Sequence, residues 1–505
     1  MTPNRGVDAD FLALPCHELA DAALSAARAA GADYADLRIQ RLTSEVIRLR
    51  DAALETSVVG REVGLAVRVV VDGTWGFASH AELAPGVAAE TARRAVGVAR
   101  TLCSLNAERI ELADEPVYSD AQWVSFYEID PFDVAAADKI GVLEDYSRRL
   151  LAADGVDHVS AAYTGVKEQS FYANTFGSSI TQQRVRVQPT LEAVTVDAAA
   201  GNFESMRTLA PPTARGWEAA VGDGVWNWSG ELARIPSLLA EKDKSPTVDP
   251  GPTDLVIDPS NLWLTIHESI GHATEYDRAI GCEAAYAGTS FATPDRLGTL
   301  HYGSPVTNVT ADRTVDFGLA TVGYDDEGVA AQNWDLVREG VFVGYQLDRV
   351  FARRLGLPRS NGCSYADSPH HVPIQRMANV SLQPGGEDLS TDDLIGRVEN
   401  GLYVVGDKSW SIDMQRYNFQ FTGQRFFRIE NGRLAGQVRD VAYQATTTEF
   451  WGAMEAVGGE STWRLGGAFN CGKGQPGQVA AVSHGCPSAL FRGIRVLNTR
   501  TEGGA

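Results

Sequence analysis

Two histidines five residues apart place a local constraint on the backbone of this chain. His267 and His272 bracket the sequence His-Glu-Ser-Ile-Gly-His and follow the apolar run Leu-Trp-Leu-Thr-Ile, which predicts a helix at about 259–274. In an α-helix of about 3.6 residues per turn, side chains at i and i+5 point about 140° apart. An unbroken α-helix therefore cannot direct both imidazoles at one point.

Gly271 offers a way to meet this constraint. Glycine allows a helix to end, loosen or take a π-type turn, and a turn of about 4.4 residues returns position i+5 to nearly the face of position i. We therefore predict an irregular helix at 270–272. Two converging imidazoles would supply nitrogen ligands to Zn²⁺, and Glu268 could take the proton of a metal-bound water. The alternative is a pair of unrelated histidines on a helix surface, because the spacing alone is a weak pattern.

A catalytic zinc site usually has three protein ligands, so a third ligand must come from elsewhere in the chain. Cys471 lies in a glycine-dense turn, 466–475, which would let a thiolate approach a metal closely. Nearby Lys473 could lower the pKa of this thiol. A buried structural cysteine is the alternative interpretation. The other candidates by residue type are His301, His370, His371, His484, Cys363 and Cys486.

The composition predicts an ordinary globular protein. The chain has 505 residues, 44% apolar and 22% charged, which is enough for two or three domains with large cores. No apolar run approaches the roughly 20 residues of a membrane span, and the first residues lack the features of a signal peptide, so we expect a cytoplasmic protein without membrane contact. Six scattered cysteines without a CxxC pair do not form a disulfide scaffold. The net charge of −21 argues against direct nucleic-acid binding.

The first half of the chain has the pattern of an α+β domain with a mainly antiparallel sheet. Helical periodicity covers 17–32, 84–104 and 132–153, and strand-like alternation covers 34–71 and the region after about 158. Turns are expected at Asp72-Gly73 and at Gly177.

A segment rich in Pro, Asp and Lys at 241–261 has the composition of a linker or a domain entry. We therefore predict an N-terminal α+β domain at 1–240 and a β-rich C-terminal domain at 241–505. The second domain carries the metal-site helix and many short strand-like runs broken by glycines.

Several fragments, taken in order, resemble the TldD/PmbA family, whose members are also called modulators of DNA gyrase. The resemblance covers about four hundred residues and is closest to the metal-bearing TldD branch. In the first half it rests on Gly64-Leu65-Ala66-Val67-Arg68-Val69, Gly76-Phe77-Ala78, and Asn174-Thr175 with Gly177. In the second half it rests on His267 to His272, Asp325-Asp326-Glu327-Gly328, Ser360-Asn361-Gly362, Arg376-Met377-Ala378-Asn379 and Cys471-Gly472-Lys473-Gly474-Gln475.

The resemblance implies a zinc-dependent metallopeptidase. Carried over to this sequence, it implies that His267, His272 and Cys471 bind zinc and that Glu268 is the general base. The resemblance also implies a dimer in which a TldD-type subunit pairs with a TldE- or PmbA-like partner. We therefore expect a heterodimer or a homodimer. The zinc would lie in an enclosed chamber that admits unfolded or extended peptides.

Two segments depart from the family pattern, 273–290 after the second histidine and the region at 409–420. Both leave the substrate preference open. Asp325, Asp326 and Glu327 are candidates to accept a hydrogen bond from a ligand imidazole, although a solvated acidic turn is the favoured interpretation. The rival functions are a non-catalytic regulatory subunit, which would need no metal, and a zinc amidase acting on small molecules.

Overall fold

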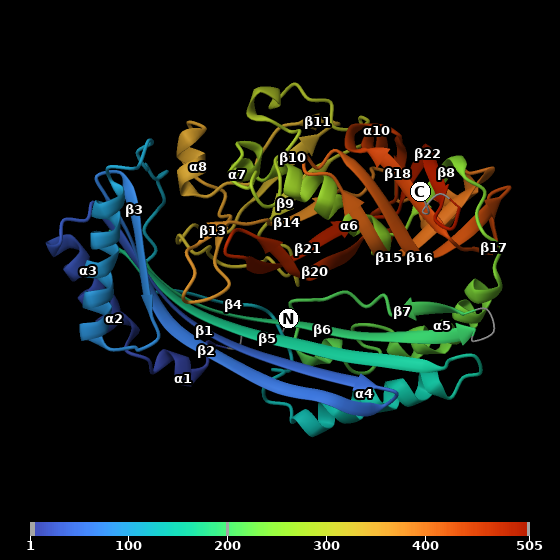
Figure 1. The fold of residues 1–505 in the computed structure, drawn as a ribbon, viewed down its shortest axis with the longest axis horizontal. Helices are drawn as coiled ribbons and strands as arrows, with labels where there is room; N and C mark the ends of the chain where they lie inside the picture. The colour runs from blue at the N-terminus through green and yellow to red at the C-terminus, as the bar shows by residue number, and fades with distance from the viewer. Residues whose placement is uncertain (1–5, 198–200, 502–505) are drawn as a thin grey trace.

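A long, bent sheet forms the N-terminal half of the chain in the computed structural model, which describes residues 6–197 and 201–501 (Figure 1). The strand order is β3-β2-β1-β5-β6-β4, and β7 pairs with β6. Its pairings are antiparallel except that of β4 with β6. The strands are β1 (Tyr34–Arg50), β2 (Ala53–Val71), β3 (Thr74–His80), β4 (Ala121–Val124), β5 (His158–Asn174), β6 (Ser179–Asp197) and β7 (Asn202–Arg207).

Two tight turns in this sheet lie where the sequence predicted them. Asp72 and Gly73 join β2 to β3 with φ values of 49° and 73°, which is the positive-φ pair of a type I′ hairpin turn. Gly177, with φ of 102°, lies between β5 and β6. The side chain of Asn174 accepts hydrogen bonds from the backbone N–H groups of Phe176 and Ser178 and holds this second turn.

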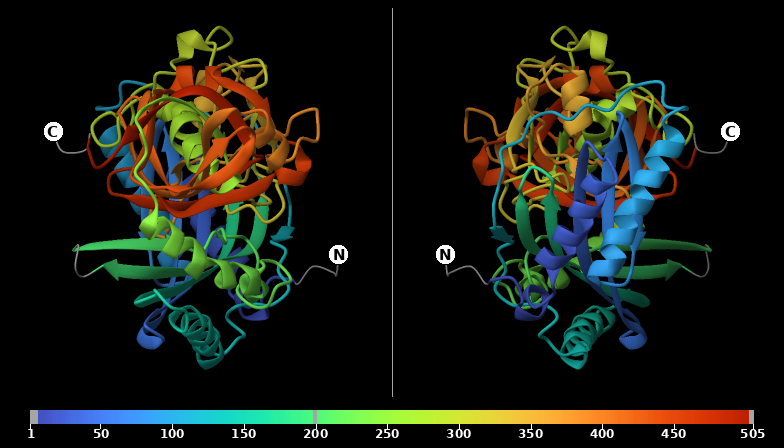
Figure 2. Two further views of the ribbon diagram at one scale, coloured as in Figure 1. Left: turned by 90° about the vertical axis from the view of Figure 1, so that its right-hand side faces the viewer. Right: turned by 90° about the vertical axis from the view of Figure 1, so that its left-hand side faces the viewer.

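Helices cover the two ends of the sheet separately (Figures 1 and 2). The predicted helices correspond to α2 (Cys16–Ala29), α3 (Pro85–Leu102) and α4 (Ala136–Leu151), and a short α1 (Ala9–Leu12) precedes them. Apolar residues of α2 and α3 pack on β1 to β3, and those of α4 and α5 (Trp228–Lys244) pack on β5 and β6. The sequence did not predict α5, because Pro236 interrupts its helical pattern.

Five strands of the C-terminal half close into a barrel. They pair in the ring β15-β8-β22-β18-β16, and the pairing of β15 with β16 closes it. Two further strands extend the wall, β17 (Arg433–Val438) beside β16 and β19 (Met454–Val457) beside β22. The barrel strands are β8 (Gly251–Ile257), β15 (Asn400–Ile412), β16 (Asn418–Glu430), β18 (Val441–Thr446) and β22 (Ala489–Asn498). The α+β class, with a β-rich C-terminal half, is therefore confirmed.

Smaller sheets and short helices complete this half. One sheet consists of β9 (Val309–Asp312), β10 (Asn333–Arg338), β11 (Val341–Phe342) and β14 (Asn379–Leu382). Two strand pairs are β12 (Ser364–Tyr365) with β13 (Ile374–Gln375), and β20 (Arg464–Lys473) with β21 (Gln478–Cys486). The short helices are α7 (Tyr276–Ala279), α8 (Arg349–Arg354), α9 (Thr391–Gly396) and α10 (Thr447–Gly452).

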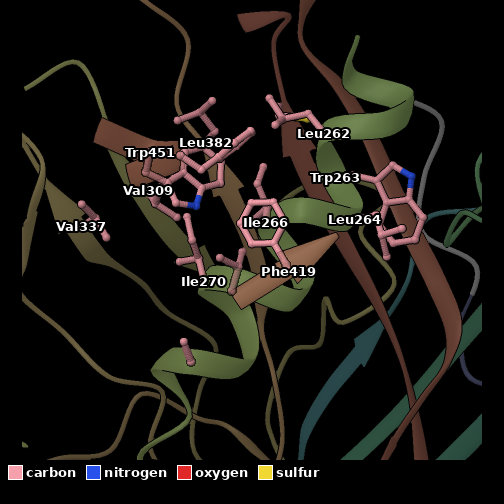
Figure 3. Close-up of a cluster of buried hydrophobic side chains, with 14 of the residues drawn as sticks. Leu262, Trp263, Leu264, Ile266, Ile270, Val309, Val337, Leu382, Phe419 and Trp451 are labelled. Carbon is pink, nitrogen blue, oxygen red and sulfur yellow. The ribbon is translucent and has the colours of Figure 1, made fainter. Parts of the chain in front are cut away.

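Helix α6 (Pro259–Ile266) lies in the centre of the C-terminal core (Figure 3). Its side chains are buried nearly all round, which is typical of a helix enclosed by other elements. Leu262, Ile266 and the following Ile270 belong to one apolar cluster with Phe419 of β16 and Trp451 of α10. Asp258 caps the helix by accepting a hydrogen bond from the Ser260 N–H at 2.9 Å. This packing fixes the end of α6, where His267 follows.

Buried ion pairs join the two halves of the chain. Arg38 of β1 donates to Asp326 at 2.6 Å, and Arg68 of β2 donates to Glu327 at 2.8 Å and to Asp36 at 2.7 Å. The expectation of a solvated acidic turn at 325–327 is therefore wrong, because these carboxylates are buried against arginines of the N-terminal sheet. Loss of one partner in such a pair leaves an uncompensated buried charge. The arginines of β1 and β2 and the acidic segment 325–327 must therefore be present together.

The division of the chain at residue 240 stays a prediction. Helix α5 runs across that position to Lys244, and β8 of the barrel begins at Gly251, inside the segment expected to be a linker. Within 6–197 and 201–501, none of the helices has both the length and the apolar character needed to cross a bilayer.

Close packing of β20 on α6 makes a testable prediction about Gly466. A Cβ atom at this position would lie 2.3 Å from Cγ of the buried Trp263 ring, so Gly466→Ala must push β20 away from α6. We expect a loss of about 1–3 kcal/mol in the free energy of unfolding, measured by urea denaturation. Gly472→Ala is the control on the same strand, because a Cβ there meets nothing within 4 Å. Equal stability of the two variants would contradict this packing.

Candidate metal centre

An irregular turn follows α6, as the histidine spacing predicted. His267–Gly271 forms a π-helix, and a 3₁₀ helix follows at His272–Thr274. The irregularity thus begins at His267 rather than at residue 270. Gln346 stabilises the turn by donating from its side-chain amide to the Gly271 carbonyl at 2.7 Å, while its oxygen accepts from the Ala378 N–H at 2.8 Å. The Gly271 carbonyl, which lies where the helix type changes, therefore has a hydrogen-bond donor.

The π-helix brings the two imidazoles together with a distant thiol. The ring centroids of His267 and His272 lie 4.7 Å apart, and Sγ of Cys471 lies 3.5 Å from Nε2 of His272. One potential ligand atom from each of the three residues lies within 4.8 Å of the others. All three side chains are buried.

His484 fixes the orientation of His267. Nδ1 of His484 lies 2.8 Å from the Val380 carbonyl oxygen, which can only accept a hydrogen bond. His484 must therefore donate through Nδ1, and its Nε2, 2.7 Å from Nδ1 of His267, is the acceptor. His267 then carries its proton on Nδ1 and presents the lone pair of Nε2. Burial lowers the pKa values of both rings, which favours these neutral forms.

Glu275 orients the second imidazole in a similar way. Its Oε2 lies 2.7 Å from Nδ1 of His272, so the carboxylate accepts that N–H and leaves Nε2 facing the thiol. Burial opposes ionisation of Glu275, but Lys473, His272 and Arg278 outweigh it and place the pKa of this carboxyl well below its usual value. Two ligand imidazoles with their second nitrogens engaged by protein acceptors are typical of metal sites.

Lys473 takes part in this network and does not contact the thiol. Its Nζ donates to Glu275 at 3.0 Å, Asp277 at 2.8 Å and Gln375 at 2.9 Å. The expectation that Lys473 lowers the thiol pKa is therefore not supported. Burial raises the pKa of Cys471, but the neighbouring His272 and Arg376 outweigh it, and the net shift is downward.

Glu268 lies near the two imidazoles and pairs with an arginine from a hairpin. Nη1 of Arg416 donates to Oε2 of Glu268 at 2.6 Å. Arg416 has φ of 63° and lies at the tip between β15 and β16, where the backbone carbonyl of Met414 accepts from the Thr289 N–H. Burial raises the pKa of Glu268, and His267, His272 and Arg416 outweigh that effect, so the pKa lies below its usual value.

The remaining candidate ligands lie in other surroundings. His371 pairs with Asp367 at 2.6 Å, and His370 lies 3.8 Å from Glu62. The thiol of Cys486 contacts the Pro259 carbonyl, and Cys363 is buried in the apolar core. All six cysteines are free.

Sequence reasoning did not identify the groups that support the three central residues. His484 was considered only as a ligand, and Glu275 and Arg416 lie in the two segments whose role was open, 273–290 and 409–420. The signal for Glu275 was its position three residues after His272, within reach of one helical turn. No local signal indicated Arg416, because the chain places it 148 residues from Glu268.

The donor set fits zinc. Two imidazoles whose Nδ1 atoms are engaged by His484 and Glu275, together with one thiol of lowered pKa, offer the nitrogen and sulfur ligands that Zn²⁺ prefers. Three protein ligands are also typical of zinc sites that keep a position open for chemistry.

Comparisons with known proteins give two family matches and full-length relatives. Residues 250–498 match the profile of the PmbA/TldA metallopeptidase C-terminal domain, and residues 35–100 match that of PmbA/TldA metallopeptidase domain 1. A metalloprotease of Methanothermobacter thermautotrophicus is 30% identical over 92% of this chain and 96% of its own length. A zinc metalloprotease TldD homolog of Saccharolobus solfataricus is 22% identical, covering 92% and 97%.

Solved structures share the fold. A Thermotoga maritima protein described as a modulator of a DNA gyrase superposes with a TM-score of 0.75 at 16% identity, covering 95% of this chain and 100% of its own. TldE from Thermococcus kodakarensis has a TM-score of 0.70 at 16% identity, covering 95% and 99%. At these identities the likeness establishes the architecture alone.

The orientation of His267 by His484 can be tested with His484→Phe. Phenylalanine keeps an aromatic ring next to Trp263, whose indole stacks on His484 at 6.3 Å, but removes the acceptor for Nδ1 of His267. We expect zinc affinity to fall about 10- to 100-fold in a competition titration with a chelator. His371→Phe removes a histidine paired with Asp367 away from the centre and should leave the affinity unchanged. Wild-type affinity in His484→Phe would contradict the assigned role.

Proposed function

Since the chain belongs to the TldD/PmbA metallopeptidase family, we propose that it is a zinc-dependent peptidase that hydrolyses unfolded or extended peptides. The observation that carries the proposal is the approach of two imidazoles and one thiol, with ligand atoms within 4.8 Å of one another, from segments about two hundred residues apart. We assign zinc binding to His267, His272 and Cys471, and the role of general base to Glu268.

Bound zinc would supply a Lewis acid that polarises the scissile carbonyl and lowers the pKa of water. The Glu268 carboxylate lies close enough to both imidazoles for them to lower its pKa, so it can accept the proton of the attacking water and pass it to the leaving amine. Arg416 donates to one carboxylate oxygen at 2.6 Å, and the Trp410 side chain also donates to this carboxylate. Burial of Glu268, at 6% exposure, excludes bulk water from this proton transfer.

A cavity beside β20 suits an extended peptide. It has a volume of about 690 Å³ and is lined by residues 464–470 of β20, by Trp263 and Trp410, and by Gln188 and Thr190 of β6. Cys471 is the next residue of the strand, although neither it nor His267, Glu268 or His272 lines the cavity. In the described part of the chain β20 pairs only with β21, so its other edge can bond a substrate backbone by strand addition. Such binding reads main chain more than side chains, which supports broad specificity.

The partner is proposed from the relatives. A fold shared with a protein named TldE supports a dimer with a TldE- or PmbA-like subunit, and a homodimer is the other form that the fold permits. Reconstitution with a separately produced TldE-like subunit, followed by light scattering, distinguishes the two.

Zinc content tests the proposed site. We expect one zinc per purified wild-type chain by elemental analysis, and a loss of most of it in His272→Ala and Cys471→Ser, because each removes one of three ligands. Cys103→Ser changes a thiol at the end of α3, whose Sγ contacts the Val71 carbonyl of the N-terminal sheet, and should keep the metal. Full zinc content in both ligand variants would refute the assignment.

Hydrolysis tests the role of Glu268 separately. Glu268→Gln should keep its zinc, and its rate of casein hydrolysis should fall at least about 100-fold. The reason is that general-base catalysis raises the rate by a factor of about 10²–10⁴. Small amides serve as the comparison substrates, since a small-molecule amidase would prefer them. Zinc-loaded wild type that hydrolyses neither class, with and without the partner, would favour a non-catalytic subunit.

A further inference from the structure

We propose that the tip of the β15–β16 hairpin, residues 410–417, is a lid that closes the candidate metal centre and must lift before a peptide reaches it. The proposal rests on the peptidase function proposed above and concerns the regulation of that site. In the closed position the lid separates the cavity beside β20 from Glu268. Lifting it admits the substrate and removes two hydrogen-bond donors from the carboxylate of Glu268.

The side chains of the metal centre have almost no contact with solvent. His267, Glu268, His272 and Cys471 are 5–6% exposed, and none of them lines the cavity beside β20. Metal-assisted hydrolysis requires the scissile carbonyl to come into contact with the metal. A part of the protein must therefore move before a peptide in this cavity can be cleaved.

Two side chains of the lid cover the proposed general base. Arg416 donates to Oε2 of Glu268 at 2.6 Å, and the Trp410 side chain donates to the same carboxylate. Trp410 also lines the cavity beside β20 and is 53% exposed. This one side chain therefore contacts the cavity on one side and Glu268 on the other. A peptide that enters the cavity meets the lid directly, and displacement of Trp410 joins the cavity to the metal centre.

The lid rests on the segment 287–291, which we call the lid base. Ser290 donates from its hydroxyl to the Ala273 carbonyl at 2.6 Å, and Nη1 of Arg278 donates to the Ala287 carbonyl at 2.7 Å. These contacts tie the lid base to the turn that follows the second metal-binding histidine. The lid base is therefore part of the metal centre, and the lid is the part that can move.

Backbone hydrogen bonds hold the lid on its base. The Met414 carbonyl accepts from the Thr289 N–H at 2.7 Å, and the Gln415 carbonyl accepts from the Phe291 N–H at 3.0 Å. Met414 itself is an exposed side chain that adds little apolar burial to this contact. Contacts of this kind can break and form again without disturbing the apolar core.

The strand that leads into the lid is loosely attached. The pairing of β15 with β16 shifts in register between Asp407 and Trp410, and such an irregularity is a place where a strand bends. Residues 408–411 are exposed, whereas 402–406 are mostly buried. Arg416 has φ of 63°, which is unfavourable for a residue other than glycine. Exposed pairing and a strained tip place the lid among the segments that open locally.

Gly288 offers a way to lift the lid by a single substitution. A Cβ atom at this position would lie 2.0 Å from the Met414 carbonyl oxygen, so Gly288→Ala must push the lid away from its base. Gly281→Ala is the matched control. Gly281 has φ of 91° and Gly288 has φ of 88°, but a Cβ at Gly281 meets nothing within 4 Å. Both variants carry similar backbone strain, and only one displaces the lid.

Hydrogen exchange of the full-length protein, followed by mass spectrometry, tests whether the lid opens locally. Exchange of the lid-base fragment 286–292, corrected for intrinsic rates, should be at least about tenfold faster than that of α6, which opens only with the core. Gly288→Ala should accelerate exchange of this fragment at least about tenfold further, and Gly281→Ala less than about twofold.

Alkylation by iodoacetamide tests whether the lid controls access to the metal centre. Cys471 should react at least about fivefold faster in Gly288→Ala than in wild type, with both proteins in the same metal state, and at the wild-type rate in Gly281→Ala. Cys486 is fully buried beside the start of α6 and reports general unfolding. Its rate should be the same in all three proteins.

A second variant keeps the proposal testable if Gly288→Ala does not fold. Oγ1 of Thr447 donates to the Arg416 carbonyl at 2.8 Å, and Thr447→Val removes this contact with little change in side-chain volume. It should accelerate exchange of the fragment 286–292 and alkylation of Cys471 by a smaller factor of about two to five.

Four results would overturn the proposal. They are exchange of the fragment 286–292 only at the rate of α6, equal effects of the two glycine variants, faster exchange in Gly288→Ala without faster alkylation of Cys471, and equal acceleration of Cys471 and Cys486. Neither measurement requires turnover or bound zinc. The lid can therefore fail in a protein that hydrolyses casein, and it can be present in one that hydrolyses nothing, so the two failures are distinguishable.

Discussion

The candidate metal centre depends on one backbone irregularity, the π-helix at His267–Gly271. A regular α-helix would separate the two imidazoles by about 140°, and the looser turn brings their ring centroids to 4.7 Å. Packing holds the turn on both sides. The buried helix α6 fixes its start, and the side chain of Gln346 satisfies the carbonyl of Gly271 at its end.

Buried hydrogen bonds then set which nitrogen each imidazole presents. Val380, His484 and His267 form a chain of hydrogen bonds with one consistent set of donors, and Glu275 has the same effect on His272. Lys473 and Arg278 balance the charge of Glu275 in a region that is almost without solvent contact. The protein's own hydrogen bonds thus fix the donor atoms, and part of the cost of ordering them belongs to folding.

Local patterns in the sequence predicted much of the fold and the irregular turn. Helices α2, α3 and α4, the hairpin turn at Asp72-Gly73 and the β-rich second half follow from periodicity and turn chemistry. Helix α5 was not predicted, because Pro236 interrupts its helical pattern. Long-range contacts could not be predicted from local patterns. Cys471 was one of several candidate ligands until a family resemblance singled it out. The pairing of Arg416 with Glu268 depends on how the hairpin between β15 and β16 folds over the candidate metal centre.

The most direct test of the central claim is zinc K-edge X-ray absorption of the purified, zinc-loaded protein. If His267, His272 and Cys471 share one ion, the fitted shell contains one sulfur at about 2.3 Å and two imidazole nitrogens at about 2.0 Å, with room for an oxygen. A shell of nitrogen and oxygen alone, in protein that carries one zinc per chain, would contradict a site built by the π-helix and the β20 thiol.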